Sequence, residues 1–304
     1  MPVFDRIAIL GIGLIGASIA RAAREHGAAN AIALYDVDPA VRQRARELAI
    51  GDVFDDAASA VGNADLVVLA VPVGVMGDAA AACAGGLKPS AIVTDVGSVK
   101  EAVVKAVVEK LPSHVHFIPG HPIAGTEHSG PDAGFATLFH NRWHILTPLE
   151  DARPDYAAAV DQLEHFWRAL GAQVERMDAD RHDVVLAVTS HLPHLIAFNI
   201  VAMAEDLESV TESEVVKYSA SGFRDFTRIA ASDPTMWRDV FLNNREAVLE
   251  VLGRFSEDLA ALQRAIRWGE GDTLYDLFDR ARRMRREVIE AGQDTPAPNW
   301  GREN

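Results

Sequence analysis

The chain has 304 residues, of which 49% are hydrophobic and 24% are charged, so it can form one large or two ordinary globular domains. Its 44 acidic and 29 basic side chains give a net charge of -15, which argues against general binding to nucleic acid or to an anionic membrane. The sequence shows no secretory signal and no stretch of about 18 uncharged apolar residues that would predict a membrane span. Its one cysteine, Cys83, excludes an internal disulfide and predicts a buried thiol in a reducing cytoplasm.

The first recognisable unit is a short apolar strand followed by a glycine-rich turn. Residues 6–10 (RIAIL) run directly into Gly11-Ile12-Gly13-Leu14-Ile15-Gly16. The spacing then predicts a helix that ends at Gly27 and a second strand over residues 31–35, which ends in Asp36. Strand, glycines, helix, strand and acid in this order are typical of a dinucleotide-binding unit.

Each glycine in the turn has a separate predicted role. Gly11 permits the tight turn, Gly13 lets the backbone approach a pyrophosphate at the helix N-terminus, and Gly16 lets the helix pack closely on the strand. Asp36 follows Gly16 by 20 residues, the spacing at which a carboxylate meets the adenosine ribose. A carboxylate there repels a 2′-phosphate, so the sequence favours NAD over NADP as the cofactor.

Asp38 is a rival for the ribose role. Because Pro39 follows it, Asp38 is better explained as a helix N-cap before a proline at the first helical position. The other residues predicted to bind the cofactor lie at the helix start and after the next strand: Leu14, Ile15, Val71 and Pro72.

Strands and helices continue to alternate up to about residue 178, which predicts an α/β fold with a doubly wound, mostly parallel sheet. Ligands of such a sheet bind outside the carboxyl ends of its strands. The further predicted strands are residues 66–71, 91–96, 116–119, 143–147 and 172–177.

Two polar side chains follow predicted strands of this sheet. Ser98 comes after residues 91–96, and His121 comes after residues 116–119 in the loop-like stretch GHPIAGTEHSG. An imidazole with an ordinary pKa of about 6.5 is a suitable general base, and His121 lies where a nicotinamide enzyme needs one.

From about Ala179 the pattern becomes helical. We therefore predict a nucleotide-binding domain at 1–178, an all-helical domain at 179–291 and a mobile tail at 292–304. The helical part is too one-sided to bury its own apolar helices, which favours a homodimer.

The first long helix of this part carries His191 and His194, three residues apart on one helix side. Pro193 should bend the helix between them and free backbone groups there. A ligand-binding pair, a purely structural pair and a metal site stay open from spacing alone. Since no third metal ligand has convincing spacing, we predict no metal site.

Arg224 and Arg228 are four residues apart, and Trp237 follows them. Paired arginines beside an aromatic ring suit recognition of a carboxylate. The alternative is an ordinary solvated helix face, with Asp225 and Arg228 as an ion pair.

Together, the stretches GIGLIGAS, DVGSVK, GHPIAGTEHSG, SHLPH and GFRDFTRIAASDPTMW resemble the prephenate/arogenate (cyclohexadienyl) dehydrogenases of tyrosine biosynthesis. The resemblance covers about residues 6–290. It implies NAD(P)-dependent oxidative decarboxylation of a cyclohexadienol that bears a ring carboxylate and a three-carbon side-chain acid.

The resemblance also implies roles for individual residues. His121 would accept the proton of the 4-hydroxyl group, Ser98 would orient His121, and Arg228 would bind a substrate carboxylate. The other residues that it places at the substrate are Thr126, Glu127, Asp183, Ser190, His191, His194 and Trp237.

Two other functions remain as alternatives. A dehydrogenase of the β-hydroxyacid type needs a catalytic lysine on the first long helix, and no lysine lies between Ala179 and Glu214. A non-catalytic NAD-binding sensor would not need His121, Ser98 and Arg228. We expect no fused mutase or regulatory domain, and the choice between prephenate and arogenate stays open.

Overall fold

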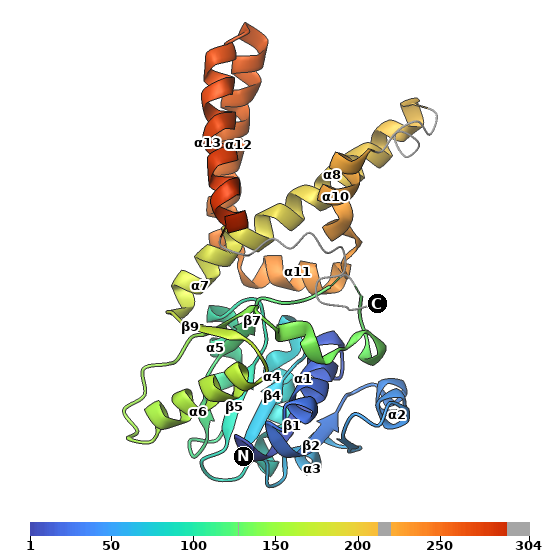
Figure 1. Ribbon diagram of the computed structural model, residues 1–304, viewed down its shortest axis with the longest axis vertical. Helices are drawn as coiled ribbons and strands as arrows, with labels where there is room; N and C mark the ends of the chain where they lie inside the picture. Colours follow the sequence, from blue (N-terminus) through green and yellow to red (C-terminus); the bar gives the residue numbers. More distant parts are fainter. Residues whose placement is uncertain (127, 212–219, 291–304) are drawn as a thin grey trace.

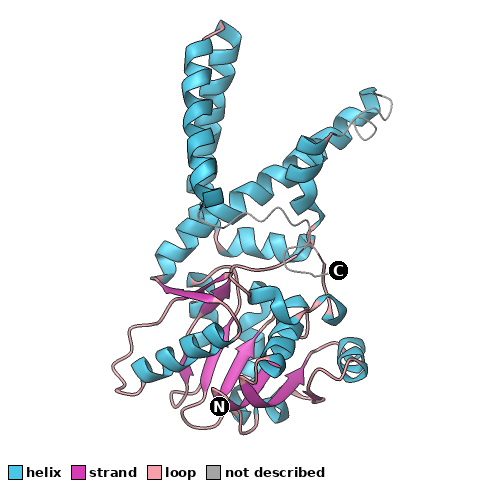
Figure 2. Ribbon diagram, in the orientation of Figure 1, coloured by secondary structure: helices cyan, strands magenta, loops and turns pink. Residues whose placement is uncertain are grey.

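The computed structural model describes residues 1–126, 128–211 and 220–290. A lower part contains the amino terminus and the strands, and an upper part of helices projects from it (Figures 1 and 2). Every strand within the described residues lies before Ala179. The predicted mobile tail, 292–304, lies outside the described residues.

The lower part is built on a six-stranded sheet with the strand order β3-β2-β1-β4-β5-β6, and all of its neighbouring strands are parallel. This is the strand order of a Rossmann fold, so the predicted fold class is confirmed. The apolar strands have no polar face because helices cover both sides of the sheet. The strands are β1 (Phe4–Leu10), β2 (Ala29–Tyr35), β3 (Asp52–Val53), β4 (Leu66–Leu69), β5 (Ile92–Asp95) and β6 (His116–Phe117).

Helices pack on both faces of the sheet and form two hydrophobic cores. Side chains of α1 and α6 belong to one core, and those of α3, α4 and α5 belong to the other. Cys83 is fully buried in the second core, as predicted, and burial raises the pKa of its thiol to about 11. The helices are α1 (Leu14–Glu25), α2 (Pro39–Glu47), α3 (Ala57–Val61), α4 (Met76–Cys83), α5 (Glu101–Val108) and α6 (Tyr156–Ala169).

The later strands do not join this sheet, which corrects the prediction of a single sheet. They form a separate three-stranded sheet of β7 (Gly120–Pro122), β8 (Trp143–Leu146) and β9 (Gln173–Arg176). Only residues 118–119 separate β6 from β7, too few for the crossover that a further parallel neighbour needs. Strand β7 instead pairs antiparallel with β8, and His121 lies inside β7, opposite Ile145.

The upper part consists of helices. Helix α11 lies over the carboxyl-end side of the lower part, while α8 and the α12–α13 hairpin project away from it (Figure 1). The elements are α7 (Ala179–Leu186), a π-helical turn (Ala187–His191), α8 (Leu192–Thr211), α10 (Ser221–Thr227), a 3₁₀ turn (Arg228–Ala231), α11 (Pro234–Asn243), α12 (Arg245–Trp268) and α13 (Gly271–Glu290).

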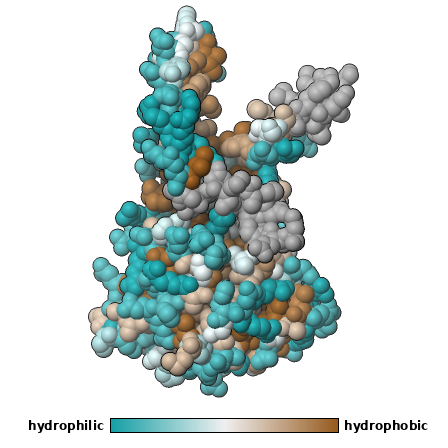
Figure 3. Space-filling view, viewed as in Figure 1, coloured by the Kyte–Doolittle hydropathy of each residue, from teal (hydrophilic) through white to brown (hydrophobic). Residues whose placement is uncertain are grey.

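The projecting helices expose large apolar side chains. Figure 3 shows them on the side of the α12–α13 hairpin that faces α8. Exposed apolar side chains gathered on one side of projecting helices are typical of a protein–protein interface. The exposed residues include Leu249, Leu259, Ile266, Phe278 and Met284.

The sequence predicted no membrane span, but one helical stretch passes the length and composition test for a span. Ala179–Asp206 is long and apolar enough for a span by length and composition, and an 18-residue window within it has a mean hydropathy of 1.7. A single such helix is weak evidence, because long helices that pack against other protein have the same composition.

Candidate active site

The glycine-rich turn has the geometry that each glycine was predicted to provide. Gly11 has a φ of +97°, and a Cβ there would lie 2.3 Å from the Ala70 carbonyl oxygen. A Cβ on Gly16 would lie 1.9 Å from the Gly11 carbonyl oxygen. Gly13 is different: it is the N-cap of α1, and within the described chain a Cβ there would meet no atom within 4 Å. The helix N-terminus is therefore open toward an anionic group.

Asp36 lies beside this turn, at the end of β2. Its Oδ2 accepts a hydrogen bond of 2.8 Å from the Ile12 amide, and its Oδ1 accepts one of 3.0 Å from the Asp38 amide. Asp38 caps α2 by accepting a bond of 2.8 Å from the Ala40 amide, so its predicted N-cap role is confirmed. Asp36 thus has the position that a ribose ligand requires, and the residues of the turn fit a dinucleotide.

His121 is half-buried in β7, beyond the carboxyl end of β6. Its Nδ1 lies 2.9 Å from Nε2 of His182, a residue that the sequence analysis did not select. Burial, with smaller effects from His182 and Lys100, holds the pKa of His121 well below its ordinary value of 6.5. His121 is therefore neutral at pH 7 and able to accept a proton.

Asp183 lies in the protein interior, at the start of α5. Its carboxylate is buried and accepts hydrogen bonds from the amides of Lys100 (2.7 Å) and Glu101 (3.0 Å), at the N-terminus of α5. Oδ1 also lies 2.8 Å from Nδ1 of His182. Both oxygens accept hydrogen bonds from the protein, so Asp183 joins α7 to α5, and its contact with the substrate stays a prediction.

Lys100 ties the turn after β5 to the strand that carries His121. Its side chain is fully buried, where it pairs with Asp95 and donates a hydrogen bond of 2.6 Å to the Gly120 carbonyl. Asp95 also accepts bonds from the amides of Gly97 (2.7 Å) and Gly120 (3.2 Å). These contacts fix the turn after β5 and the residue directly before His121.

Ser98 is half-buried in the same turn. It was predicted to orient His121, but among the residues that the structure describes the side-chain hydrogen bond to His121 comes from His182. The neighbouring Val99 packs against Trp237 and Val240 of α11, so Ser98 lies where the two parts of the molecule meet.

The predicted bend at Pro193 is a π-helical turn directly before it, Ala187–His191. Proline has no N–H and clashes with the carbonyl four residues earlier, so the preceding turn widens. His191 ends this turn and His194 follows it, and the two side chains contact different groups.

His191 points into the protein interior and is fully buried. Its Nδ1 lies 3.0 Å from the side-chain nitrogen of Asn244, which also donates a bond of 2.9 Å to the Asp183 carbonyl. Burial lowers the pKa of His191 to about 4. His191 and Asn244 thus stabilise the junction between α7 and α12.

His194 is half-buried and better placed to meet a ligand. Its ring stacks on Trp237, with 3.7 Å between centroids, and its Nδ1 donates a bond of 2.8 Å to the Ser190 carbonyl. Ser190 therefore fixes the ring by its backbone. Burial lowers the pKa of His194, and the nearby positive charge of Arg228 lowers it further.

Arg224 and Arg228 lie in different surroundings. Arg228 opens the 3₁₀ turn after α10, exposed and close to His194, whereas Arg224 lies on the surface and pairs with Asp225 at 3.4 Å. Thr126 is half-buried in the loop after β7 and accepts a bond from the His128 amide, while Glu127 lies outside the described residues.

In the described part of the chain, no three His, Cys, Asp or Glu side chains are arranged to hold a metal ion. His191 and His194 contact different protein groups, Asn244 and Ser190. Their surroundings fit the structural and ligand-binding alternatives better than the metal alternative.

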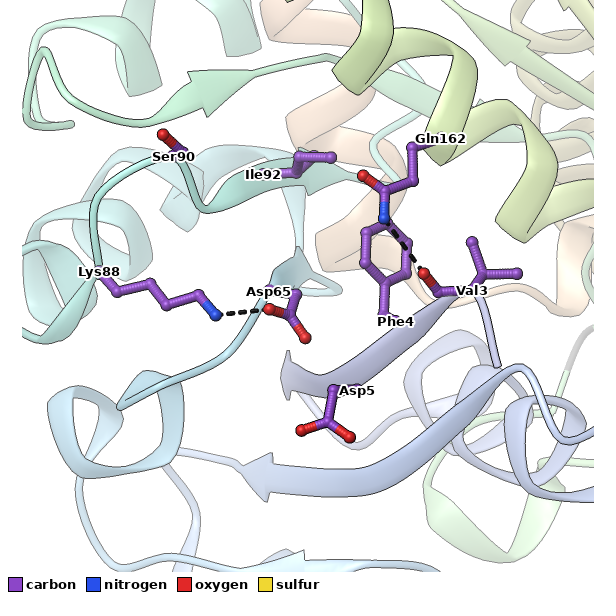
Figure 4. Close-up of a pocket in the computed structure, with 8 residues that line it drawn as sticks. All are labelled: Val3, Phe4, Asp5, Asp65, Lys88, Ser90, Ile92 and Gln162. Carbon is purple, nitrogen blue, oxygen red and sulfur yellow. Dashed lines mark hydrogen bonds and ion pairs between the residues drawn. The ribbon is translucent and has the colours of Figure 1, made fainter. Parts of the chain in front are cut away.

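A hollow lies at the opposite edge of the sheet, next to the amino ends of β1 and β5 (Figure 4). Its polar groups pair with one another: Lys88 with Asp65, and Gln162 with the Val3 carbonyl. Ligands of parallel sheets bind at the carboxyl ends, so we place the active site at His121.

A Rossmann sheet with an open glycine turn and a neutral histidine beyond its strand ends defines a nucleotide-dependent dehydrogenase. The sequence models of the prephenate dehydrogenase nucleotide-binding and dimerization domains match residues 19–176 and 178–280. The chain belongs to the prephenate dehydrogenase family.

Relatives and solved structures agree with this assignment. The chain is 46% identical to cyclohexadienyl dehydrogenase of Zymomonas mobilis, over 94% of this chain and 96% of the relative. It is 34% identical to prephenate dehydrogenase of Bacillus subtilis, over 92% and 75%. Aquifex aeolicus prephenate dehydrogenase, solved with hydroxyphenyl propionate and NAD+, matches with a TM-score of 0.85 and 33% identity, over 93% and 98%.

Substitutions of two glycines should separate cofactor binding from folding. Gly13→Ala should weaken NAD binding by about tenfold or more at nearly unchanged stability, because the new methyl group meets only the cofactor. Gly16→Ala should lower the melting temperature of the apoprotein, because its methyl group overlaps the Gly11 carbonyl. Calorimetric NAD titration and thermal melts measure the two effects; equal NAD affinity in Gly13→Ala and wild type would contradict this account.

Proposed function

We propose that the protein catalyses NAD-dependent oxidative decarboxylation of prephenate, arogenate or both, in the cytoplasmic biosynthesis of tyrosine. The observation that carries the proposal is a neutral His121 beyond the strand ends of a nucleotide-binding sheet, together with an Arg228–His194–Trp237 cluster that packs, through Trp237, on Val99 in the turn after β5. Membership of the family and the resemblance to an NAD-bound relative support it.

The reaction needs a base, a hydride acceptor and groups that bind an anionic substrate. Bound NAD supplies the hydride acceptor. The 4-hydroxyl group gives its proton to Nε2 of His121 while the hydride leaves C4. The ring carboxylate then leaves as CO₂, its electron pair completes the aromatic ring, and the proton returns to the ring oxygen. The products are 4-hydroxyphenylpyruvate or tyrosine, CO₂ and NADH.

Substrate binding falls to the helical side of the site. Arg228 would form charge-assisted hydrogen bonds with a substrate carboxylate, and Nε2 of His194 faces the ligand because its Nδ1 bonds the Ser190 carbonyl. Trp237 holds the His194 ring by stacking. Ser98 and Thr126 would also contact the substrate. The same role for Glu127 rests only on the family resemblance.

The cofactor would lie along the carboxyl ends of β1, β2 and β4. Gly13 would leave room for the pyrophosphate, while Gly11 and Gly16 permit the tight turn and the close packing of α1. The Leu14 and Ile15 amides lie at the α1 terminus that would face the pyrophosphate. Asp36 would bind the ribose hydroxyls, and Val71 and Pro72 would contact the cofactor from the end of β4.

The projecting helices support a homodimer as the working form. The residues that match the dimerization domain of the family include exposed apolar side chains of these helices, among them Leu249, Leu259, Ile266 and Phe278. A second copy would cover them and bring the interface close to the substrate side of the site.

Sedimentation should show a particle of twice the 32.9 kDa chain mass. Phe278→Asp should shift it toward the monomer, because a carboxylate would be buried in the apolar interface. Val37→Asp, at an exposed apolar residue far from these helices, is the control. A wild type that remains monomeric at micromolar concentration would refute the dimer.

His121→Gln should lower kcat by about 10²- to 10⁴-fold, because the amide cannot accept the hydroxyl proton. The rate of NADH formation with prephenate or arogenate measures the loss. His116→Gln is the matched control, since His116 is also buried and also bonds a side chain, Asp155, at 3.0 Å. Near-normal turnover by His121→Gln would remove the assignment of the base.

Arg228→Leu should raise the substrate KM by about 10- to 100-fold and change kcat little, because a charge-assisted hydrogen bond contributes about 1.5–3 kcal/mol. Arg224→Leu removes a neighbouring arginine that pairs on the surface, and its KM should equal that of wild type. Steady-state kinetics with saturating NAD distinguish the two variants. Equal KM values for both would show that Arg228 does not bind the carboxylate.

A further inference from the structure

A chain of hydrogen bonds leads from His121 into the helical part of the molecule. Nδ1 of His121 lies 2.9 Å from Nε2 of His182, and Nδ1 of His182 lies 2.8 Å from Oδ1 of Asp183. His182 is fully buried, and Asp183 is almost fully buried. His121 belongs to β7, whereas the other two residues belong to α7.

The carboxylate at the end of this chain sets its direction. Both oxygens of Asp183 already accept bonds from backbone amides, of Lys100 and Glu101, so the carboxylate acts only as an acceptor. The Nδ1 of His182 must then carry the proton that it shares with Asp183. The Nε2 of neutral His182 is an acceptor, and it receives the Nδ1–H of His121.

This direction decides which nitrogen of His121 can act as a base. With its proton on Nδ1, neutral His121 presents an unprotonated Nε2. With the proton on Nε2 of His121 instead, two unprotonated ring nitrogens would face each other, or His182 would have to donate from Nε2 and leave the Asp183 carboxylate without its donor. The catalytic nitrogen is thus selected by a carboxylate two hydrogen bonds away.

We propose that His182 and Asp183 are positioning residues for the reaction: they hold His121 in the tautomer with a free Nε2 and share the positive charge when it takes the hydroxyl proton. This inference rests on the proposed role of His121 as the base. The proton stays within the His121–His182 pair, opposite the Asp183 carboxylate, until it returns to the ring oxygen. No further reactant is needed.

A purely structural role is the alternative, because Asp183 also binds the start of α5 and removing it would disturb that contact. The test therefore leaves Asp183 intact and changes His182. His182→Leu removes the acceptor, whereas the side-chain carbonyl of His182→Gln can still accept the Nδ1–H of His121 but cannot take up a proton. His116→Gln, in a separate His–Asp pair, controls for the loss of a buried imidazole.

We expect His182→Leu to lower kcat on the order of 10- to 100-fold with substrate KM and NAD affinity close to wild type, which is a smaller loss than for His121→Gln. His182→Gln should recover part of this kcat, and His116→Gln should match wild type. Unchanged kcat in His182→Leu would overturn the proposal. A lower kcat accompanied by a higher substrate KM and weaker NAD binding, with no recovery in His182→Gln, would also overturn the proposal.

A second measurement needs neither activity nor a His182 variant. In ¹⁵N spectra of histidine-labelled wild-type protein near pH 7, with the His121 signals assigned by their absence in His121→Gln, Nδ1 should be protonated and Nε2 should not. Protonation at Nε2 instead would overturn the inference. If His121→Gln retains normal turnover, the proposed base fails; if only His182→Leu retains it, the base stands and the positioning role fails.

Discussion

The carboxylate of Asp183 joins the two parts of the molecule at the place where we propose the chemistry occurs. It comes from the first helix of the upper part and accepts hydrogen bonds from the N-terminal amides of α5 in the lower part. A carboxylate at a helix N-terminus also meets the favourable end of the helix dipole. The same group orients His182 and, through it, His121, so the docking of the parts and the state of the base depend on one side chain.

The surroundings of His121 favour a neutral base. Burial and the buried Lys100 oppose a positive charge on the ring. Lys100 is itself held by Asp95 and the Gly120 carbonyl, so it fixes β7 without pairing with a substrate carboxylate. Arg228, close to His194 in the helical part, is the cationic group that we propose binds the substrate. A chain with a net charge of -15 can thus offer a local positive charge to an anionic substrate.

The parts of the fold that the sequence predicted correctly depend on local chemistry. The glycine turn and the Asp38 cap each follow from the backbone preferences of a few neighbouring residues. Pro193 predicted only a bend, and the π-helical turn before it was not foreseen. The second sheet was missed because strand periodicity does not say which strands pair. The pairing of β7 with β8 follows from the short connection between β6 and β7, which leaves no room for a crossover.

The sequence selected candidate residues for the active site but not the contacts between them. Motifs led to His121, His194, Arg228 and Trp237, yet the bond that orients His121 comes from a residue 61 positions later. His182 could have been selected, because it stands beside Asp183 in the sequence. Asn244 could not, since nothing near it in the chain indicates that it bonds both His191 and the Asp183 carbonyl.

The most direct test of the proposed function is NADH formation by the purified wild-type protein, with NAD and either prephenate or arogenate. The account predicts turnover with at least one of them, and the relative kcat/KM values define the substrate preference. NAD binding without turnover on either compound would contradict the account and favour a nucleotide-binding sensor on the same fold.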